Sequence, residues 1–248
     1  MTFEQQLDLY LRARCTLLVI VSSEEDRVLA AIRAIAQSYN PPRGCLMWDS
    51  AEGFQALTTC VGIPSARDPL HALEQADRLE GDVLFVLKDF HDCWNIGPVR
   101  RKLRNLASRM KYCKKSLLVL TPRSRIPDEL RDDAVILTLP PPTLPELELV
   151  LDHLTRTPGV TVRLSPAGLE KILQAALGLS VAQAQRVFAR AIVADGILDD
   201  ADIALVTEEK RQIIHESEAL EFFPTTQTPE DVGGLQALKN WLRLRERA

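Results

Sequence analysis

The chain has 248 residues, of which 46% are hydrophobic and 26% charged, and its formal net charge at pH 7 is −4. These shares match those of globular proteins and exclude a wholly disordered, collagen-like or fibrous chain. No apolar run approaches the ~20 residues of a membrane-spanning helix, so we expect no membrane partner. No two of the five cysteines stand in C-x-x-C spacing, which favours reduced thiols in a cytoplasmic protein.

The first half of the chain alternates short apolar runs with helical patterns. Runs that are apolar throughout are typical of strands buried on both faces of a parallel sheet. These predicted strands are 16–21, 45–48, 83–87, 116–120 and 134–139. Apolar residues at helical spacing predict helices over 2–14, 28–35 and 96–110, and Asp68-Pro69 predicts the start of another. The pattern indicates an α/β fold with a five-stranded parallel sheet, in a domain over 1–140.

The composition changes at the proline run 140–142. Beyond it only helical patterns appear, and each carries an apolar stripe. The four stripes cover 145–153, 166–176, 181–194 and 201–217. We therefore expect a small helical bundle over 141–219. Residues 220–248 are predicted to be a linker followed by the start of a further module.

A parallel sheet followed by a helical lid is the plan of an AAA ATPase module, which carries a phosphate loop after its first strand. That loop has the pattern G-x-x-x-x-G-K-S/T, whose backbone amides and lysine hold the phosphates. Here the first strand leads into SSEEDR at 22–27, and none of the eleven glycines is followed by lysine. The acids of this loop suit a helix N-terminus, but they would repel phosphate. The sequence predicts a degenerate P-loop domain that binds no nucleotide.

The predicted strand 83–87 is followed by Lys88-Asp89, where an AAA ATPase has two carboxylates for Mg²⁺ and water. If Asp89 is aligned with the catalytic carboxylate, Lys88 replaces the metal-binding one. If Asp89 is aligned with the metal-binding carboxylate, Phe90 replaces the catalytic one. We therefore predict no catalytic, cofactor-binding or metal-binding residue in this chain, and no enzyme activity.

Other AAA positions are recognisable as vestiges. Thr121, after the fourth predicted strand, stands at the position of the sensor residue. Arg131 lies near the arginine-finger position, although the usual R-P-G-R is absent. GLSVAQA at 178–184 resembles an AAA lid motif and places Arg186 at a second-sensor position. The alternative for Arg186 is a solvated side chain on an amphipathic helix.

The last stretch, TPEDVGGLQALK at 228–239, looks like the D-V-G-G-L opening of an AAA module. We expect the chain to be the N-terminal part of a longer protein that continues into a catalytic module. ATP and Mg²⁺ are expected as cofactors of that module only.

Five further stretches resemble the hypothetical chloroplast reading-frame AAA ATPases of algal plastids and cyanobacteria. They are FEQQL at 3–7, VLKDFH at 86–91, RKLRNL at 101–106, VFARAI at 187–192 and EKRQII at 209–214. The likeness runs through nearly all of the chain. It implies a noncatalytic front domain in a protein of the bacterial cytosol or plastid stroma, and a link to photosynthetic regulation and inorganic-carbon use.

The basic charge is local. Between Pro98 and Ile126 there are ten basic residues and no acid, and such a stripe is a candidate surface for an anionic partner. The ten are Arg100, Arg101, Lys102, Arg104, Arg109, Lys111, Lys114, Lys115, Arg123 and Arg125. The partner is either nucleic acid or an acidic surface of a neighbouring protomer, such as Asp195, Asp199, Asp200 and Asp202.

Two functions remain in competition. The first is a noncatalytic AAA-like domain for assembly, regulation or partner binding in a ring-forming ATPase, with its own C-terminal module and neighbouring protomers as partners. The second is a nucleic-acid-binding module that uses the basic helix 99–115. Because exposed ion pairs contribute only ~0–1 kcal/mol each, we expect the isolated chain to be a monomer or a weak, salt-sensitive oligomer.

Overall fold

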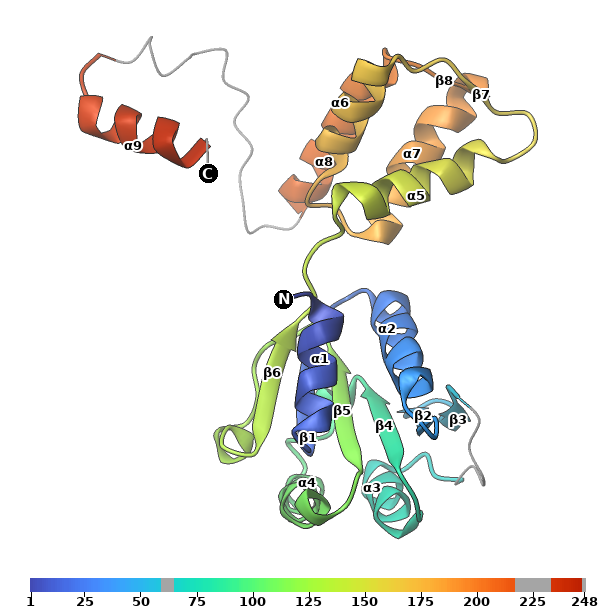
Figure 1. The fold of residues 1–248 in the computed structure, drawn as a ribbon, viewed down its shortest axis with the longest axis vertical. Coiled ribbons are helices and arrows are strands. Elements are labelled where there is room, and N and C mark those ends of the chain that lie inside the picture. The colour runs from blue at the N-terminus through green and yellow to red at the C-terminus, as the bar shows by residue number, and fades with distance from the viewer. Residues whose placement is uncertain (59–64, 217–232, 247–248) are drawn as a thin grey trace. The chain divides into compact units, whose positions relative to one another are not determined.

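The computed structural model describes residues 1–58, 65–216 and 233–246. They form two compact units, Met1–Pro141 and Pro142–Ala248. The boundary lies inside the proline run, where the fixed φ and the missing N–H donors favour an extended connection over regular structure. Figure 1 shows a sheet with helices in the first unit and a helical bundle in the second.

Six strands form one sheet in the described residues of the first unit, in the order β3-β2-β4-β5-β1-β6. The five predicted strands are confirmed, and all of their pairings are parallel. They are β1 (Leu17–Val21), β2 (Gly44–Asp49), β4 (Val83–Lys88), β5 (Ser116–Thr121) and β6 (Ala134–Thr138).

The sixth strand, β3 (Gly53–Ala56), pairs antiparallel with β2 at one edge of the sheet. A tight turn makes this hairpin, in which the Asp49 carboxylate accepts the N–H groups of Ala51 and Glu52 at 3.0 and 2.7 Å. Gly53 follows with φ +77°, which favours glycine. Sequence reasoning missed β3 because four residues with two of them buried do not make a recognisable apolar run.

Helices cover both faces of the sheet. Alternate residues of a strand point to opposite faces. Leu18 therefore packs with α1 (Phe3–Arg12) and α2 (Glu25–Ser38), whereas Val19 faces α3 (Pro69–Arg78) and α4 (Gly97–Arg109). Both faces are buried, which is why the strands are apolar throughout.

The basic helix predicted over 99–115 is shorter than expected. α4 ends at Arg109 and is followed by a 3₁₀ turn, Met110–Tyr112. Cys113 then has extended backbone, with φ −127° and ψ 168°, because the chain has to enter β5. Lys114 and Lys115 thus lie in the connection between helix and strand. Two other 3₁₀ turns, Phe90–Asp92 and Asp128–Leu130, follow β4 and β5 along the chain.

The second unit is a helical bundle around a hydrophobic core that includes Leu147, Ile172 and Phe188. Its helices are α5 (Leu144–Thr155), α6 (Pro166–Ala176), α7 (Val181–Asp195) and α8 (Asp202–Glu216). The predicted cap Ser165 accepts the Gly168 N–H at 2.9 Å. A short parallel pair, β7 (Thr161–Val162) with β8 (Ile197–Leu198), was not predicted, since two-residue strands carry no periodicity.

Near the C-terminus the structure has one more helix, α9 (Gln236–Glu246). Gly234, in the turn before it, has φ +74°. The predicted linker, which begins at residue 220, and residues 228–232 of the TPEDVGGLQALK stretch lie outside the described residues.

Candidate functional site

The carboxyl ends of β1, β4 and β5 meet at one edge of the sheet, because the three strands are parallel neighbours (Figure 1). Open α/β sheets bind their ligands at this edge. A small cleft of about 220 Å³ lies there. Its lining residues come from the end of β5, the start of α2 and the loops that follow the three strands: Ser22, Ser23, Glu25, Asp89, Leu120, Thr121 and Pro122.

An internal ion pair spans this edge. The Lys88 Nζ atom lies 2.7 Å from Glu25 Oε2, and the side chains are 24% and 36% exposed. The hydrogen bond that the Lys88 ammonium donates to Glu25, together with the negative charges of Glu25, Asp49 and Asp89, raises the pKa of Lys88 against the opposing effect of burial. A lysine from the metal-carboxylate position and a glutamate from the phosphate-loop position thus neutralise each other.

The loop after β1 is held by its own hydrogen bonds. Ser22 N–H donates to the Thr121 carbonyl at 2.9 Å, and the Ser22 hydroxyl accepts the Glu24 N–H at 2.9 Å. The first turn of α2 then carries Glu25 and Asp26, whose charges suit the positive end of a helix. Carboxylates therefore stand where an ATPase presents amide donors to phosphate.

The residues after Lys88 have separate roles. Asp89 has φ +50° and an exposed side chain, with Oδ1 3.8 Å from His91 Nδ1. Phe90 is completely buried, with its ring edge-on to Trp48 at a centroid distance of 5.4 Å. The alignment that would put a catalytic carboxylate at position 90 therefore falls on a residue of the hydrophobic core.

The side chains at the remaining vestigial positions interact with nearby residues or are exposed to solvent. The buried Thr121 hydroxyl accepts the Arg123 N–H at 3.1 Å and so shapes the loop after β5. Arg131 is exposed and pairs with Asp128 at 3.0 Å. Arg186 is exposed on α7, in the second unit.

Half of the cations in the predicted basic stripe are matched by acids of the same unit. Five of its ten cations form ion pairs, while the Lys115 ammonium donates to the carbonyls of Ala76 and Asp77 at 3.3 and 2.9 Å. The pairs are Arg100–Glu129, Lys102–Asp77, Arg109–Asp77, Lys111–Asp133 and Lys114–Asp82. Burial would raise the pKa of Asp77, but Lys102 and Arg109 outweigh it and hold that pKa below its usual value.

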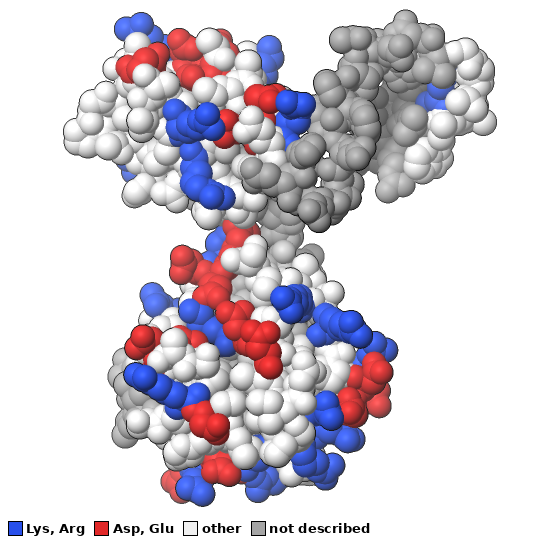
Figure 2. All heavy atoms as spheres, turned by 180° about the vertical axis from the view of Figure 1, so that it is seen from behind, with Lys and Arg blue, Asp and Glu red and all other residues white. Residues whose placement is uncertain are grey.

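The matching acids lie outside residues 98–126, so a count along the sequence misses them. Figure 2 shows acidic and basic side chains intermixed on the face of the first unit that it displays. In the described part of the chain, Arg101, Arg104, Arg123 and Arg125 form no ion pair. Arg123 and Arg125 line a polar cavity of about 670 Å³ beside His91. The charge without a carboxylate partner among the described residues is thus that of these four arginines and Lys115, rather than a stripe of ten cations.

Sequence reasoning missed Arg43, a buried arginine at the opposite edge of the sheet. The available signal is a single cation between the turn Asn40-Pro41-Pro42 and a buried strand. Because Arg43 lies directly before β2, its side chain packs at the amino end of the sheet and does not extend into solvent.

Two negative findings concern the described residues alone. None of their helices has both the length and the apolar character needed to cross a membrane. They also contain no group of three or more side chains suited to hold a metal ion.

The strand order and the helical second unit define an AAA ATPase fold. The solved structure of Caenorhabditis elegans PCH-2 superposes with a TM-score of 0.57 and 11% identity, over 85% of this chain and 68% of that chain. The Thermotoga maritima RuvB Holliday junction branch migration motor superposes with a TM-score of 0.53 and 15% identity, over 83% and 67% of the two chains. These likenesses concern the fold.

The chain belongs to the SpoVK-like AAA ATPase family. The N-terminal domain of that family matches residues 3–139, and its second domain matches 145–217. The chain is 32% identical to the AAA domain-containing protein ycf46 of Pyropia yezoensis, over 100% of this chain and 50% of the relative. It is 34% identical to ycf46 of Guillardia theta, over 99% and 48%. The chain spans about half the length of these relatives and corresponds to their N-terminal half.

Proposed function

We propose that this chain is a noncatalytic AAA-like module that serves assembly, regulation or partner binding in a longer, ring-forming ATPase. Its partners are then its own C-terminal module and neighbouring protomers. ATP and Mg²⁺ act at that C-terminal module, which corresponds to the half of the relatives that this chain does not cover.

The Lys88–Glu25 ion pair carries this proposal. A triphosphate entering the cleft would meet the Glu25 carboxylate, and Mg²⁺ would meet the Lys88 ammonium. Both encounters are repulsive, and separating the pair leaves two half-buried charges without partners.

The test is phosphate release from MgATP by the purified chain, with Lys88→Ala as the matched variant. We expect no turnover above buffer for either protein. Turnover that rises in proportion to the chain and disappears in Lys88→Ala would assign catalysis to this cleft and overturn the proposal.

We also propose a location and a process for the protein. We place the protein in the cytoplasm, either the bacterial cytosol or the plastid stroma, and connect it with photosynthetic or inorganic-carbon regulation. The family resemblance supports both statements.

A second candidate function is nucleic-acid binding, favoured by the four arginines without ion pairs. Arg101 and Arg104 are exposed three residues apart on α4, so they lie on one side of the helix. Reversing both to Glu should abolish binding to a labelled DNA or RNA oligonucleotide measured by fluorescence anisotropy. Arg33→Glu, on the exposed side of α2, is the control and should leave binding unchanged. If the wild-type chain gives no anisotropy change at low salt, this function is excluded.

A further inference from the structure

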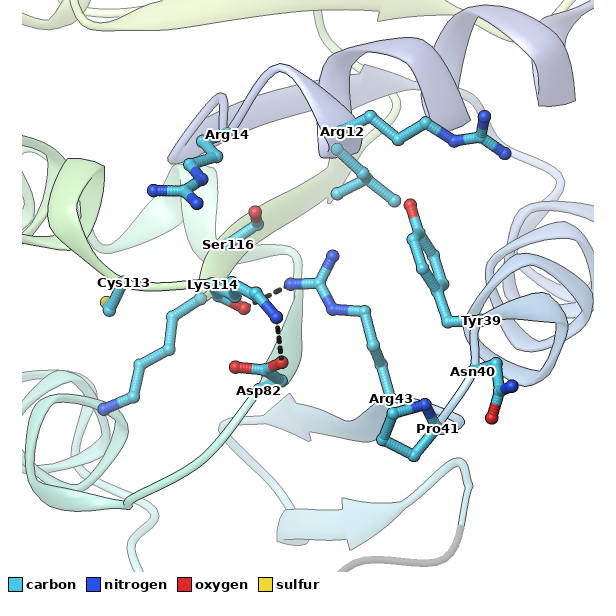
Figure 3. Close-up of a pocket in the computed structure, with 12 residues that line it drawn as sticks. Arg12, Arg14, Tyr39, Asn40, Pro41, Arg43, Asp82, Cys113, Lys114 and Ser116 are labelled. Carbon is cyan, nitrogen blue, oxygen red and sulfur yellow. Dashed lines mark hydrogen bonds and ion pairs between the residues drawn. The ribbon is translucent and has the colours of Figure 1, made fainter.

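A second pocket lies at the amino ends of the strands, opposite the edge closed by Lys88 and Glu25. Figure 3 shows it between the end of α1, the end of α2 and the segment that enters β5. Its volume is about 260 Å³. The lining includes five cations but a single carboxylate, that of Asp82: Arg12, Arg14, Arg43, Lys114 and Lys115.

Arg43 is the central residue of this pocket. It is only 7% exposed, and its guanidinium lies 5.3 Å from the centre of the Tyr39 ring. One Nη donates to the Lys114 carbonyl, while the buried Nε–H has no hydrogen-bond partner among the described residues. No carboxylate in that part of the chain forms an ion pair with Arg43.

Such an arrangement is costly without a ligand. Arginine is almost never fully buried unless it is paired, and a buried charge without a counter-charge destabilises a fold. Stacking on Tyr39 offsets only part of this cost. The site therefore lacks one component, a negative charge with hydrogen-bond acceptors.

The acidic residues near Arg43 already interact with other side chains. Asp82 pairs with Lys114 at 3.2 Å. Asp8 pairs with Arg12 at 2.8 Å and accepts the Tyr39 hydroxyl at 2.9 Å. Arg14 is exposed at the rim and forms no ion pair in the described residues. The excess positive charge of this cavity is therefore not neutralised by the fold.

We propose that this pocket binds a small oxyanion, the phosphate or carboxylate group of a small molecule. The planar guanidinium of Arg43 matches two oxygens of such a group, and Arg14 adds a second cation from the rim. A volume of about 260 Å³ lies just below the ~300–1,000 Å³ of ordinary ligand pockets, so the ligand is small. This inference is independent of the proposed function, because it concerns the other edge of the sheet.

The first experiment titrates the chain with inorganic phosphate and, separately, with succinate, at constant ionic strength set by chloride. We expect saturable heat and a rise in unfolding temperature with at least one of them, at concentrations up to about 10 mM. The stronger of the two assigns the oxyanion to the phosphate or the carboxylate class. If neither ion gives a response beyond that of chloride, the proposal is wrong.

The second experiment locates the site. Arg14→Gln removes the rim cation without touching the core, and we expect roughly tenfold weaker binding, since a charge-assisted hydrogen bond is lost. Arg33→Gln, an exposed arginine elsewhere, is the matched control and should keep wild-type affinity. Equal affinity of Arg14→Gln and wild type would overturn the assignment.

Arg43→Met removes the central charge. We expect it to lose the response to the oxyanion while keeping the wild-type circular dichroism spectrum, because methionine fills an apolar space of similar length. If Arg43→Met fails to fold, the Arg14→Gln and Arg33→Gln pair decides the question alone. A folded Arg43→Met protein that binds the oxyanion as tightly as wild type contradicts the proposal.

Discussion

The two edges of the sheet handle buried charge in opposite ways. At the carboxyl edge, Lys88 and Glu25 neutralise each other beside a cleft that in an ATPase would hold nucleotide. At the amino edge, Arg43 is more deeply buried than either of them and has no carboxylate partner among the described residues. The two charges at the carboxyl edge thus have each other as partners, whereas the charge of Arg43 at the amino edge has no counter-charge among the described residues.

If the carboxyl edge takes no nucleotide, as we propose, this contrast shows how an AAA fold can do without that ligand. The fold does not leave an empty, charged cleft, because an unpaired buried charge is unfavourable. It supplies the missing counter-charges from its own side chains, and the phosphate-loop position contributes a carboxylate in place of amide donors. By the same reasoning, a cation left without a counter-charge at the other edge indicates an external anion.

The largest expected effect is a loss of stability, and it tests whether Phe90, at the carboxyl edge of the sheet, is part of the hydrophobic core. Phe90→Ala should destabilise the first unit by about 3–5 kcal/mol, because it empties a fully buried site against Trp48. The measurement is denaturant unfolding at equilibrium. Ile96→Ala, an exposed neighbour, should change the free energy of unfolding by less than about 0.5 kcal/mol. Equal effects of the two substitutions would contradict a core role for Phe90.

The next prediction concerns the paired cations near the amino edge. Asp77→Asn should cost about 1 kcal/mol at neutral pH, since it removes the partner of Lys102 and Arg109. The folded state lowers the pKa of Asp77, so this stabilisation is present above the ordinary Asp pKa and is lost as the pH falls. Unfolding of wild type and Asp77→Asn should therefore converge in acid.

The control for this pair is Asp128→Asn, since Asp128 and Arg131 form a well-exposed ion pair. We expect a change near zero at every pH, within about 0.5 kcal/mol. A difference between wild type and Asp77→Asn that grows in acid would show that the Asp77 carboxylate is not the stabilising form.

A smaller effect is expected for the ion pair at the carboxyl edge. A double-mutant cycle with Lys88→Met and Glu25→Gln should give a coupling of about 0.5–1 kcal/mol, kept low because Glu25 is partly solvated. The folded state raises the pKa of Lys88, so the coupling is present at neutral pH and disappears as the pH rises through that pKa. A coupling free energy of zero at low salt would show that Lys88 and Glu25 do not stabilise each other. It would contradict the difference that we describe between the two edges.

The smallest effect concerns self-association. Asp195 and Asp199 accept the N–H groups of Ile197 and Ala201, and Ser165 holds Asp200 by two hydrogen bonds, so these acids already have local partners. We expect light scattering to give a monomer, or an oligomer that dissociates between ~0.15 and ~0.5 M salt as charges are screened. A hexamer that persists at the higher salt would show that this chain drives assembly.

The fold was predictable because its signals are local and redundant. Runs such as LLVIV in β1 read as buried parallel strands whatever their neighbours. The lost phosphate loop was equally visible, since it requires glycines and a lysine that SSEEDR lacks. Short elements such as β3 gave no such signal.

The electrostatics of the sites were not predictable, because they depend on residues that are distant in the chain. Glu25 and Lys88 are 63 positions apart and meet only through the order of the strands. Asp77 takes up two of the ten cations of residues 98–126 from a neighbouring helix. Arg43 looks like a surface residue in the sequence, but β2 begins beside it and draws it into the sheet edge.

The central claim is that the carboxyl edge no longer accepts nucleotide, and calorimetric titration of MgATP into the chain tests it most directly. We predict no saturable heat up to about 1 mM MgATP, where even a weak specific site of about −4 kcal/mol would be half filled. A micromolar dissociation constant that Lys88→Ala alters and Arg33→Gln does not would contradict the account.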